Sequence, residues 1–462
     1  MISSPVQARK AGMDRLRFTS AHLAWTAMAF SILIWGFGDL QSKTLGNTGN
    51  WYRIVLVLFG AGTAVLALVA NLERLSRALT GPVVLLSLYA LFAMISSLYI
   101  PEYSFYSMWK GLEVAVDVVI LMALLSQRQP QASAILAYRI IVALFAVLIA
   151  LYWVEAWLMP SAALTPSRGV IPFMLHGVLP VTGENALAFI SAVVAFAAGC
   201  ALLRSKSPWR WMFFALVAAS AVAMLILTQS RTSLVGLVVA ACVYLLMDRR
   251  FGLLAVMLTG LASVAALTTF TDIAERFIVR GQPKELFISL SGRTHAWEAA
   301  WALFQESPVI GNGFAAAARA EILGITGAST LHGAIFDVMV GVGLLGLIPW
   351  IAAIIWTSVR LLGMNLRPRS WGDSRAVQGL HAEMIGMLAL ILVRSSTSSG
   401  LAMHDHTFML FLTVVAYACA ASNPSPRASP SSITSAILAP ARKVAAPRAP
   451  ARSSMIPRRN AR

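Results

Sequence analysis

The chain is a succession of long apolar stretches separated by short polar connections. Most stretches contain about 20 residues, the length a helix needs to cross a hydrocarbon core of about 30 Å. The hydrophobic pattern predicts spans near 22–39, 53–71, 82–100, 111–126, 135–158, 184–203, 211–228, 233–247, 252–270, 333–357, 380–398 and 405–421. We therefore expect an all-α, polytopic integral membrane protein with about twelve transmembrane helices.

Composition agrees with a membrane location. Of the 462 residues, 58% are hydrophobic and only 12% are charged, whereas about a quarter are charged in an average soluble protein. The net charge of +17 does not indicate nucleic-acid binding, because the basic residues avoid the apolar stretches and form no patch interleaved with aromatics. The cysteines Cys200, Cys242 and Cys419 all lie in apolar stretches, which is typical of small buried residues rather than of a metal or disulfide framework.

The distribution of basic residues predicts the orientation. If the N-terminus is inside and the spans alternate, most basic residues of the N-terminus and connections are cytoplasmic. These are Arg9, Lys10, Arg15, Arg17, Arg74, Arg77, Arg128, Arg204, Lys206, Arg210, Arg249, Arg250, Arg360, Arg367, Arg369 and Arg375. The outward connections hold far fewer, so the positive-inside rule puts both termini in the cytoplasm. The first apolar stretch is longer than a signal-peptide core and is expected to be an uncleaved span.

This orientation divides the chain into five parts. They are a basic cytoplasmic N-terminus (1–21), transmembrane helices one to nine (22–270), a long periplasmic loop with an amphipathic helix (271–331), transmembrane helices ten to twelve (332–421) and a disordered basic cytoplasmic tail (422–462). The tail is rich in Pro, Ala, Ser and Arg, a composition that does not support a packed core.

Three outward positions carry candidate chemistry, and the first is Arg231. It lies in the short turn 229–233, where the eighth predicted span begins. The free N–H groups of a helix start attract anions, and a guanidinium adds a permanent charge whose fork fits phosphate oxygens. The alternative is an interfacial side chain that extends to lipid headgroups. Spacing alone leaves these two interpretations equal.

The second position is Arg293, at the start of a predicted helix in the long loop. Trp297, Trp301 and Phe304 recur at helical spacing and form an apolar stripe. A cation in the first turn of a helix is unfavourable unless an anion offsets it, which is a hint of a ligand. An interfacial helix without a ligand explains the same pattern. Pro308, Gly311 and Gly313 (in 308–313) are expected to end the helix in a turn.

The third position is His332, at the outward start of the tenth span. Its ordinary pKa of about 6.5 suits a base near neutral pH, although a lone histidine at a helix start also serves as a cap or a satisfied polar contact. Gly341, Gly343 and Gly346 follow and permit close helix packing.

Other charged groups support competing hypotheses. Glu113 and Asp117 are four residues apart and share a helix face, and intramembrane carboxylates suggest ion or proton transport. Glu155 lies near Arg168 in the predicted outer region and is a candidate ion-pair partner for it. His404 and His406 are two apart, on opposite sides of a helix, so they do not chelate one metal easily. The sequence contains no GxGxxG or Walker loop.

Together the three motifs resemble the O-antigen ligase superfamily, which includes O-antigen ligases and O-antigen and exopolysaccharide polymerases. The resemblance covers roughly residues 165–400. It is carried by Ser230-Arg231-Thr232, Gly292-Arg293-Thr294, Trp297, the stretch from Ser307 to Phe314, His332, Gly343-Leu344-Leu345-Gly346, Arg168 and the stretch from Gly183 through Asn185 to Ala188. The chain departs from the pattern at Gly333, where the family often has Asn or Ser, and at Glu184, where it often has a basic residue.

The resemblance implies a metal-independent, inverting glycosyltransferase that uses a glycan on undecaprenyl diphosphate. Arg231 and Arg293 would bind the diphosphate, His332 would be the catalytic base, and Arg168, Asn185 and Trp297 would contact substrate. No cofactor is implied. The enzyme would lie in the bacterial inner membrane with its active site facing the periplasm.

The expected partners are the lipid-linked donor, a glycan or lipid A-core acceptor and membrane lipid. Polysaccharide-export and chain-length proteins are further candidates. A polymerase is the first interpretation and an O-antigen ligase the second. A transporter or flippase using Glu113 and Asp117 is the competing class, and a purely structural subunit is a third.

Overall fold

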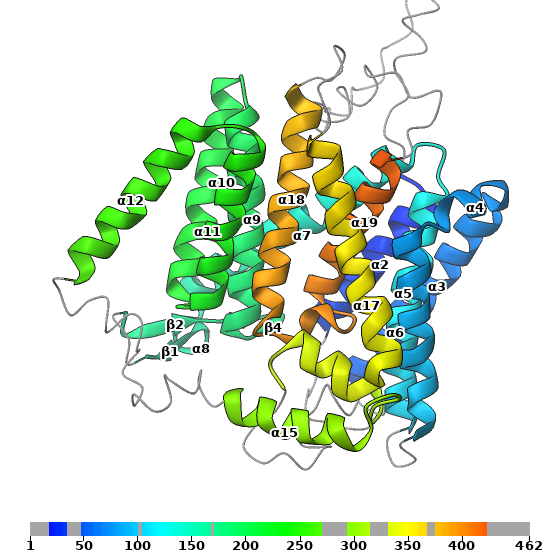
Figure 1. Cartoon of the computed structure of the whole chain (residues 1–462). Helices are drawn as coiled ribbons and strands as arrows, with labels where there is room; N and C mark the ends of the chain where they lie inside the picture. Colours follow the sequence, from blue (N-terminus) through cyan, green and yellow to red (C-terminus); the bar gives the residue numbers. More distant parts are fainter. Residues whose placement is uncertain are drawn as a thin grey trace, which may run out of the picture.

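The computed structural model describes residues 18–34, 48–99, 104–167, 171–269, 293–314, 331–366 and 375–422. Its long helices run side by side as a bundle, except Phe251–Thr269, which leans away from the others (Figure 1). They are α2 (Ser20–Ile34), α3 (Thr48–Val69), α5 (Gly81–Ile95), α6 (Ser104–Leu125), α7 (Pro130–Leu158), α9 (Glu184–Arg204), α10 (Pro208–Leu227), α11 (Arg231–Met247), α12 (Phe251–Thr269), α17 (Ala334–Leu366), α18 (Arg375–Ser395) and α19 (His406–Ser422). The short helices are η2 (Leu72–Arg74), α4 (Leu75–Ala78), η3 (Ser96–Tyr99), α8 (Pro160–Ala163), α15 (Arg293–Glu306) and η5 (Ser399–Leu401).

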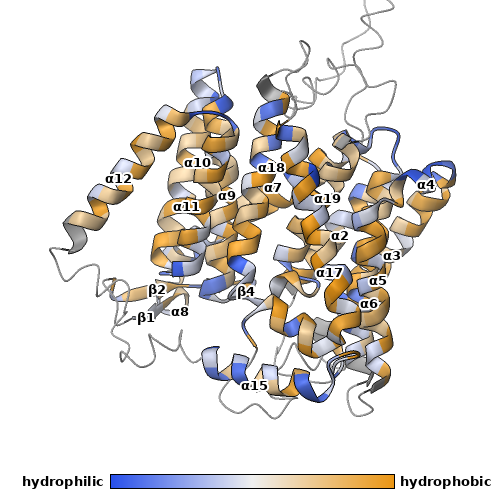
Figure 2. Ribbon diagram, viewed as in Figure 1, coloured by the Kyte–Doolittle hydropathy of each residue, from blue (hydrophilic) through white to orange (hydrophobic). Residues whose placement is uncertain are grey.

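The described part of each predicted apolar stretch lies mostly on one of the long helices. Seven helices of the described residues are long and apolar enough to cross a membrane, namely those containing Trp51–Val69, Gly81–Leu98, Pro130–Leu158, Glu184–Arg204, Pro208–Leu227, Ala334–Leu366 and Val377–Ser395. Apolar residues cover the lengths of the helices, and hydrophilic ones gather toward their ends (Figure 2). The expectation of a mostly helical, multi-pass membrane protein is confirmed. The number of twelve spans and their orientation stay predictions.

The connections separate to the two ends of the bundle. Helix α15 and four short strands lie at one end, and α4 lies at the other (Figure 1). We call the first of these the α15 end. The described parts of the connections predicted to face outward lie at the α15 end, and the connection around α4, which is predicted to face inward, lies at the opposite end. The N-terminal residues 1–17 and the tail from 423 lie outside the described residues.

Two small antiparallel hairpins at the α15 end were not predicted. They pair β1 (Leu164–Pro166) with β2 (Phe173–Leu175), and β3 (Gly177–Val178) with β4 (Val181–Thr182). So few residues carry almost no strand signal, and hairpins this short need support from other elements. Helix α7 provides it, because the Glu155 carboxylate accepts the backbone N–H groups of Val178 at 2.8 Å and Leu179 at 2.9 Å. The Tyr152 hydroxyl is 2.6 Å from Thr182 Oγ1.

Helix α17 is interrupted where a turn from the preceding connection enters it. Gly343 has a φ of +58°, outside the helical region. The turn 308–314 fills the break through four backbone hydrogen bonds, which join Asn312 N to Val340 O (2.7 Å), Gly313 N to Gly341 O (2.8 Å), Leu344 N to Pro308 O (2.9 Å) and Leu345 N to Val309 O (3.1 Å). A broken helix at membrane depth is tolerated only when protein groups satisfy the freed backbone. The turn does this.

The glycines in both segments are required by this close approach. A Cβ atom on Gly343 would lie 2.4 Å from Val309 O, and one on Gly311 would lie 2.6 Å from the backbone nitrogen of Gly343. Both positions also have positive φ, which only glycine adopts readily. The expectation that glycines allow close packing is therefore confirmed, although the partner is a turn rather than a second helix.

The turn is also attached to the rest of the bundle. The Phe314 N–H donates to Ser96 Oγ at 3.0 Å, and the Phe314 ring meets the edge of the buried Tyr89 ring at 6.2 Å. Helix α5, which carries Tyr89, packs along α17. The turn 308–314 thus joins α15, α17 and α5 into one unit.

The apolar side chains of helix α15 lie in two environments, one buried against the bundle and one exposed. Ala296 and Ala300 form its buried face, and Phe304 packs partly against the same cluster. Trp297 stacks on Phe336 with ring centroids 5.2 Å apart and planes 14° apart. Trp301 is half exposed, at 50%. The small residues therefore hold α15 against the bundle together with Trp297, and Trp301 faces away.

A Gly343→Ala substitution is expected to lower the free energy of unfolding by about 2 kcal/mol or more, because it adds left-handed backbone strain and a clash with Val309 O. Heat unfolding of the purified protein in detergent, followed by tryptophan fluorescence, measures this. Gly363→Ala in the same helix is the control, since a Cβ there meets nothing within 4 Å, and it should be neutral or stabilising. Equal effects of the two substitutions would contradict the proposed packing.

Candidate active site at the α15 end of the bundle

Arg231 is the first residue of α11 and lies directly after a strained turn. Gln229 in that turn has a φ of +53°, uncommon for a residue other than glycine. Its side-chain amide donates to Ile171 O at 3.1 Å and Phe173 O at 2.8 Å, and its carbonyl accepts from Ser167 Oγ at 3.3 Å. These bonds hold the turn against the β1–β2 hairpin. They fix where α11 begins and thereby where Arg231 lies.

Asn185 lies in the first turn of α9, beside the start of α11. Ser230 Oγ donates to Asn185 Oδ1 at 3.3 Å. The Asn185 backbone carbonyl accepts from Arg394 Nη2, also at 3.3 Å. Helix α18 approaches here too, since Thr397, just past its end, donates to Thr232 Oγ1 at 3.2 Å. The ends of α9, α11 and α18 therefore converge on one place.

Arg293 is the first residue of α15 and lies within electrostatic range of Arg231. Burial lowers the pKa of Arg293, and the positive charge of Arg231 lowers it further. Two guanidinium groups from elements far apart in sequence thus share one region. At the N-terminus of a helix this arrangement repels cations and favours an anion.

His332 lies directly before α17 with a φ of +52°. Burial lowers the pKa of its imidazole, followed by the positive charges of Arg293 and Arg394. The lowered pKa favours the neutral form of the ring, which a general base needs. A positive φ at a non-glycine residue is a strained conformation of the kind that occurs at functional sites.

Trp297 supports the backbone next to His332. Its indole N–H donates to Leu331 O at 2.9 Å, and its ring stacks on Phe336 in the first turn of α17. A Cβ added to Gly333 would lie 3.1 Å from the Phe336 ring and 3.4 Å from Trp297 Nε1. This packing gives a physical reason for glycine after the histidine. The contacts favour a positioning role for Trp297, while its predicted contact with substrate stays untested.

The structure brings Arg231, Arg293 and His332 into one electrostatic cluster, with Asn185 attached to it through Ser230. Arg168 lies outside the described residues, so neither its predicted role nor its pairing with Glu155 is tested. Sequence reasoning missed Arg394, although the signal was present: an arginine within an apolar span is unusual enough to suggest a function.

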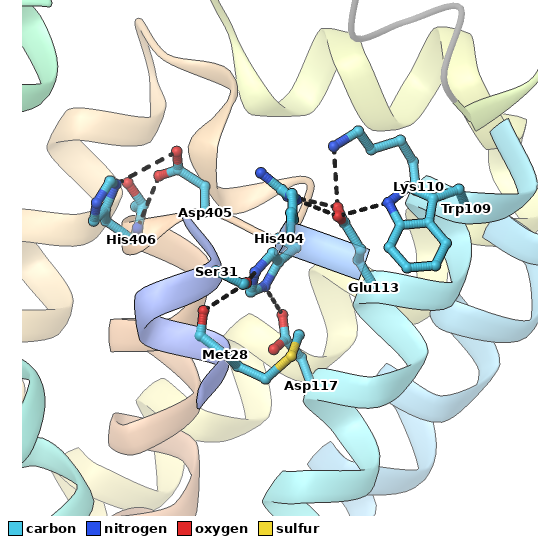
Figure 3. Close-up of polar contacts among 11 residues, drawn as sticks. Met28, Ser31, Trp109, Lys110, Glu113, Asp117, His404, Asp405 and His406 are labelled. Carbon is cyan, nitrogen blue, oxygen red and sulfur yellow. Dashed lines mark hydrogen bonds and ion pairs between the residues drawn. The ribbon is translucent and has the colours of Figure 1, made fainter. Parts of the chain in front are cut away.

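A buried polar cluster accounts for Glu113, one of the carboxylates that suggested transport. Arg53 donates to both of its oxygens, at 2.5 and 2.7 Å. Lys110 Nζ lies 3.1 Å from Oε2, and Trp109 Nε1 donates to Oε1 at 2.9 Å (Figure 3). With two cations and an indole around it, Glu113 joins α3 to α6 and is fully engaged within the protein.

Asp117 belongs to a second series of buried polar contacts, which Figure 3 also shows. Its Oδ2 lies 2.7 Å from His404 Nδ1, and His404 Nε2 lies 2.9 Å from Ser31 Oγ, which donates to Met28 O (Figure 3). The Ser31 hydroxyl donates its proton to Met28 O, so Ser31 Oγ accepts the Nε2–H of His404. One further proton is then shared between His404 Nδ1 and the Asp117 carboxylate. These contacts attach the connection between α18 and α19 to α2 and α6.

His404 and His406 point to different surroundings, as their spacing predicted. His404 faces Asp117, and the His406 ring lies 5.6 Å from the Phe145 ring. Figure 3 shows the two rings well apart. Within the described residues, no three His, Cys, Asp or Glu side chains gather as they would around a metal ion.

Comparison with known proteins finds a family that is similar to part of this chain. Residues 214–351 match the family model described as O-antigen ligase. This segment of the chain is therefore similar to the O-antigen ligase family. The matched segment contains Arg231, Arg293, His332 and the turn docked in α17, whereas Asn185 and Arg394 lie outside it. Among curated proteins, none matches the chain. The predicted resemblance to the O-antigen ligase superfamily is confirmed, and proteins of this family are glycosyltransferase-like membrane enzymes.

Glu113→Gln is expected to destabilise the protein by about 3–5 kcal/mol, because it leaves Arg53 and Lys110 buried without their counter-charge. Thermal unfolding in detergent measures the loss. Glu298→Gln is the matched control, since the Glu298 side chain is 79% exposed, and it should change stability by less than about 0.5 kcal/mol. A Glu113→Gln protein as stable as the control would return this carboxylate to the list of transport candidates.

Proposed function

We propose that this protein is a glycosyltransferase that polymerises or transfers a glycan carried on undecaprenyl diphosphate. The reaction takes place at the periplasmic face of the bacterial inner membrane. The observation that carries the proposal is that Arg231, Arg293 and His332, whose pKa is lowered, act on one another at one end of a membrane bundle. A lipid-linked diphosphate reaches such a site from the bilayer with its sugar outside the membrane.

The chemistry follows from the three side chains. Arg231 and Arg293 bind the diphosphate through charge-assisted hydrogen bonds. His332 accepts the proton of the acceptor hydroxyl as that oxygen forms a bond to the anomeric carbon. The bond from the anomeric carbon to the phosphate oxygen breaks, and its electron pair leaves with undecaprenyl diphosphate. The two guanidinium groups stabilise the charge that develops there, and attack from the opposite face inverts the anomeric centre.

The energy and charge requirements of this reaction are met without further components. The glycosyl diphosphate linkage is already activated, so no nucleotide is consumed at the transfer step. The guanidinium groups neutralise the leaving group, and we therefore propose a metal-independent reaction. Arg168 and Asn185 are assigned to substrate binding on the family resemblance, and Trp297 to the same region.

The acceptor distinguishes the two candidate activities. A polymerase extends a second lipid-linked glycan, and a ligase transfers the glycan to lipid A-core. The matched family does not distinguish the two activities, and the residues of the site are compatible with both acceptors because they bind the donor. Reconstitution with one lipid-linked donor and each acceptor in turn separates the two activities by the size and lipid of the product.

Transport is a less favoured alternative because Glu113 and Asp117 have partners inside the protein. Transport predicts that the lipid-linked donor is not changed chemically and that His332 is dispensable. A His332→Ala protein that supports normal polymer length, together with loss of polymer in a Glu113→Ala or Asp117→Ala protein that folds, would favour transport over transfer.

Arg231→Lys and Arg293→Lys are each expected to lower kcat/KM for the lipid-linked donor by about 10²–10³-fold, since lysine keeps the charge but loses the fork. The assay uses purified protein in nanodiscs with lipid-linked donor and acceptor. Arg128→Lys, at an exposed position beyond the other end of the bundle, is the control and should retain wild-type activity. Full activity in both site variants would remove the basis of the proposal.

The pH profile tests the role of His332. A base must be neutral, so activity should fall as pH falls through its pKa, and the lowered pKa places this loss below pH of about 6.5. Because the charge of Arg293 contributes to the lowering, the residual activity of Arg293→Gln should decline at a higher pH than that of the wild type. A profile that is flat between about pH 5 and 8 would show that His332 only positions substrate.

A further inference from the structure

Arg394 is a buried cation at the α15 end that no part of the proposed mechanism uses. It lies in the last turn of α18, whose C-terminal end points toward the α15 end (Figure 1). The residue is only 7% exposed. One nitrogen of its guanidinium, Nη2, donates to the Asn185 carbonyl at 3.3 Å. Its Nε is buried without a hydrogen-bond partner among the described residues.

Electrostatics place Arg394 with the other site residues. Its charge acts on His332, and it is repelled by Arg293. Arg231 in turn acts on Arg293. Arg293 and Arg394 therefore both act on the His332 imidazole, and Arg231 acts on Arg293, although no two of the three arginines are close in sequence.

The negative charge that acts on Arg394 does not form an ion pair with it. Asp405 attracts it, but within the described residues no carboxylate lies within ion-pair distance of Arg394. The Asp405 carboxylate is engaged elsewhere, because Oδ1 accepts the Thr407 N–H at 3.0 Å and Oδ2 lies 3.8 Å from His406 Nδ1. Asp405 thus caps the start of α19 rather than pairing with the arginine.

The C-terminal end of α18 explains part of this arrangement. A cation in the last turn of a helix is stabilised by the helix dipole, so Arg394 does not need a ligand to remain charged. The dipole does not explain why the Asn185 carbonyl orients the guanidinium, or why the Arg394 Nε–H is buried without an acceptor. Buried polar groups are normally satisfied, and a donor that is not satisfied in the unliganded protein is available to a ligand.

We infer that Arg394 is a third guanidinium of the diphosphate site, which donates its Nε–H to a phosphate oxygen of the lipid-linked donor. The inference rests on the proposed function and extends it by one residue. The diphosphate of such a donor carries two negative charges, which suits a site built from several cations. The bond to Asn185 holds the fork in a fixed orientation, so the arginine is preorganised for phosphate.

The test uses the full-length protein in nanodiscs and undecaprenyl diphosphate as the probe, with binding measured by microscale thermophoresis. Arg394→Met is expected to raise the Kd by about tenfold or more, the usual effect of losing a hydrogen bond to a charged group. Arg128→Met removes an exposed arginine at the opposite end and should leave the Kd within about twofold of wild type, the usual outcome for a distant surface change. A Kd for Arg394→Met equal to that of this control overturns the inference.

A second variant changes the charge around Arg394 without replacing Arg394 itself. Asp405→Asn keeps a side-chain cap for α19 but removes the negative charge that attracts Arg394. The probe should then bind more tightly than in the wild type. If Arg394→Met does not give a folded, monodisperse protein, this variant decides the question, and binding no tighter than wild type overturns the inference.

Two further measurements separate the outcomes. A purely structural Arg394 predicts a lower unfolding temperature for Arg394→Met but an unchanged stabilisation of the folded variant by added probe, which would contradict a binding role. Arg231→Met tests the underlying proposal. If it weakens binding and Arg394→Met does not, only the inference about Arg394 fails. If neither weakens binding, the proposed diphosphate site fails as well.

Discussion

The four backbone hydrogen bonds between the turn 308–314 and the break in α17 are the constraint on which the rest of the α15 end depends. A helix interrupted at Gly343 would leave N–H and C=O groups without partners at membrane depth, at a cost of several kcal/mol for each group. The turn supplies those partners and is itself held at Ser96. Because α15 leads directly into the turn, its docking fixes α15 against the helix that begins just after His332. The distance between Arg293 and His332 is thus set by backbone geometry rather than by flexible side chains.

The site is then completed from helices that are distant in sequence. The starts of α9 and α11 and the end of α18 meet through Ser230, Asn185 and Arg394. Gathering like charges in a partly buried place is unfavourable without an anion. The fold tolerates it because each cation is attached to a rigid helix end. Such preorganisation is what electrostatic stabilisation of a leaving group requires.

The buried polar cluster of α2, α3 and α6 has a supporting part in this scheme. It satisfies Glu113 internally and uses Asp117 and His404 to secure the connection between α18 and α19. That connection is also held by the Trp350 indole, which donates to Leu401 O at 3.2 Å. The α18 end, with Arg394, is therefore anchored on both sides. Intramembrane carboxylates indicate transport by default, and here the tertiary contacts give them another explanation.

The pattern of residues along the chain was enough to predict the helices and the chemical types of the side chains at the site. Long apolar runs dictate membrane helices because only a helix satisfies its own backbone in lipid, and the motifs around Arg231, Arg293 and His332 were sufficient to indicate the family. What the sequence left open required contacts between distant segments: the hairpins held by Glu155, the use of Gly311 and Gly343 to admit a turn into α17, and the convergence of Arg394 with Asn185. Periodicity reports which face of a helix is apolar, but it carries no information about which helix end lies against which other. Only the packed bundle decided that, because the close approach of backbones and the pairing of buried charges are properties of the tertiary structure.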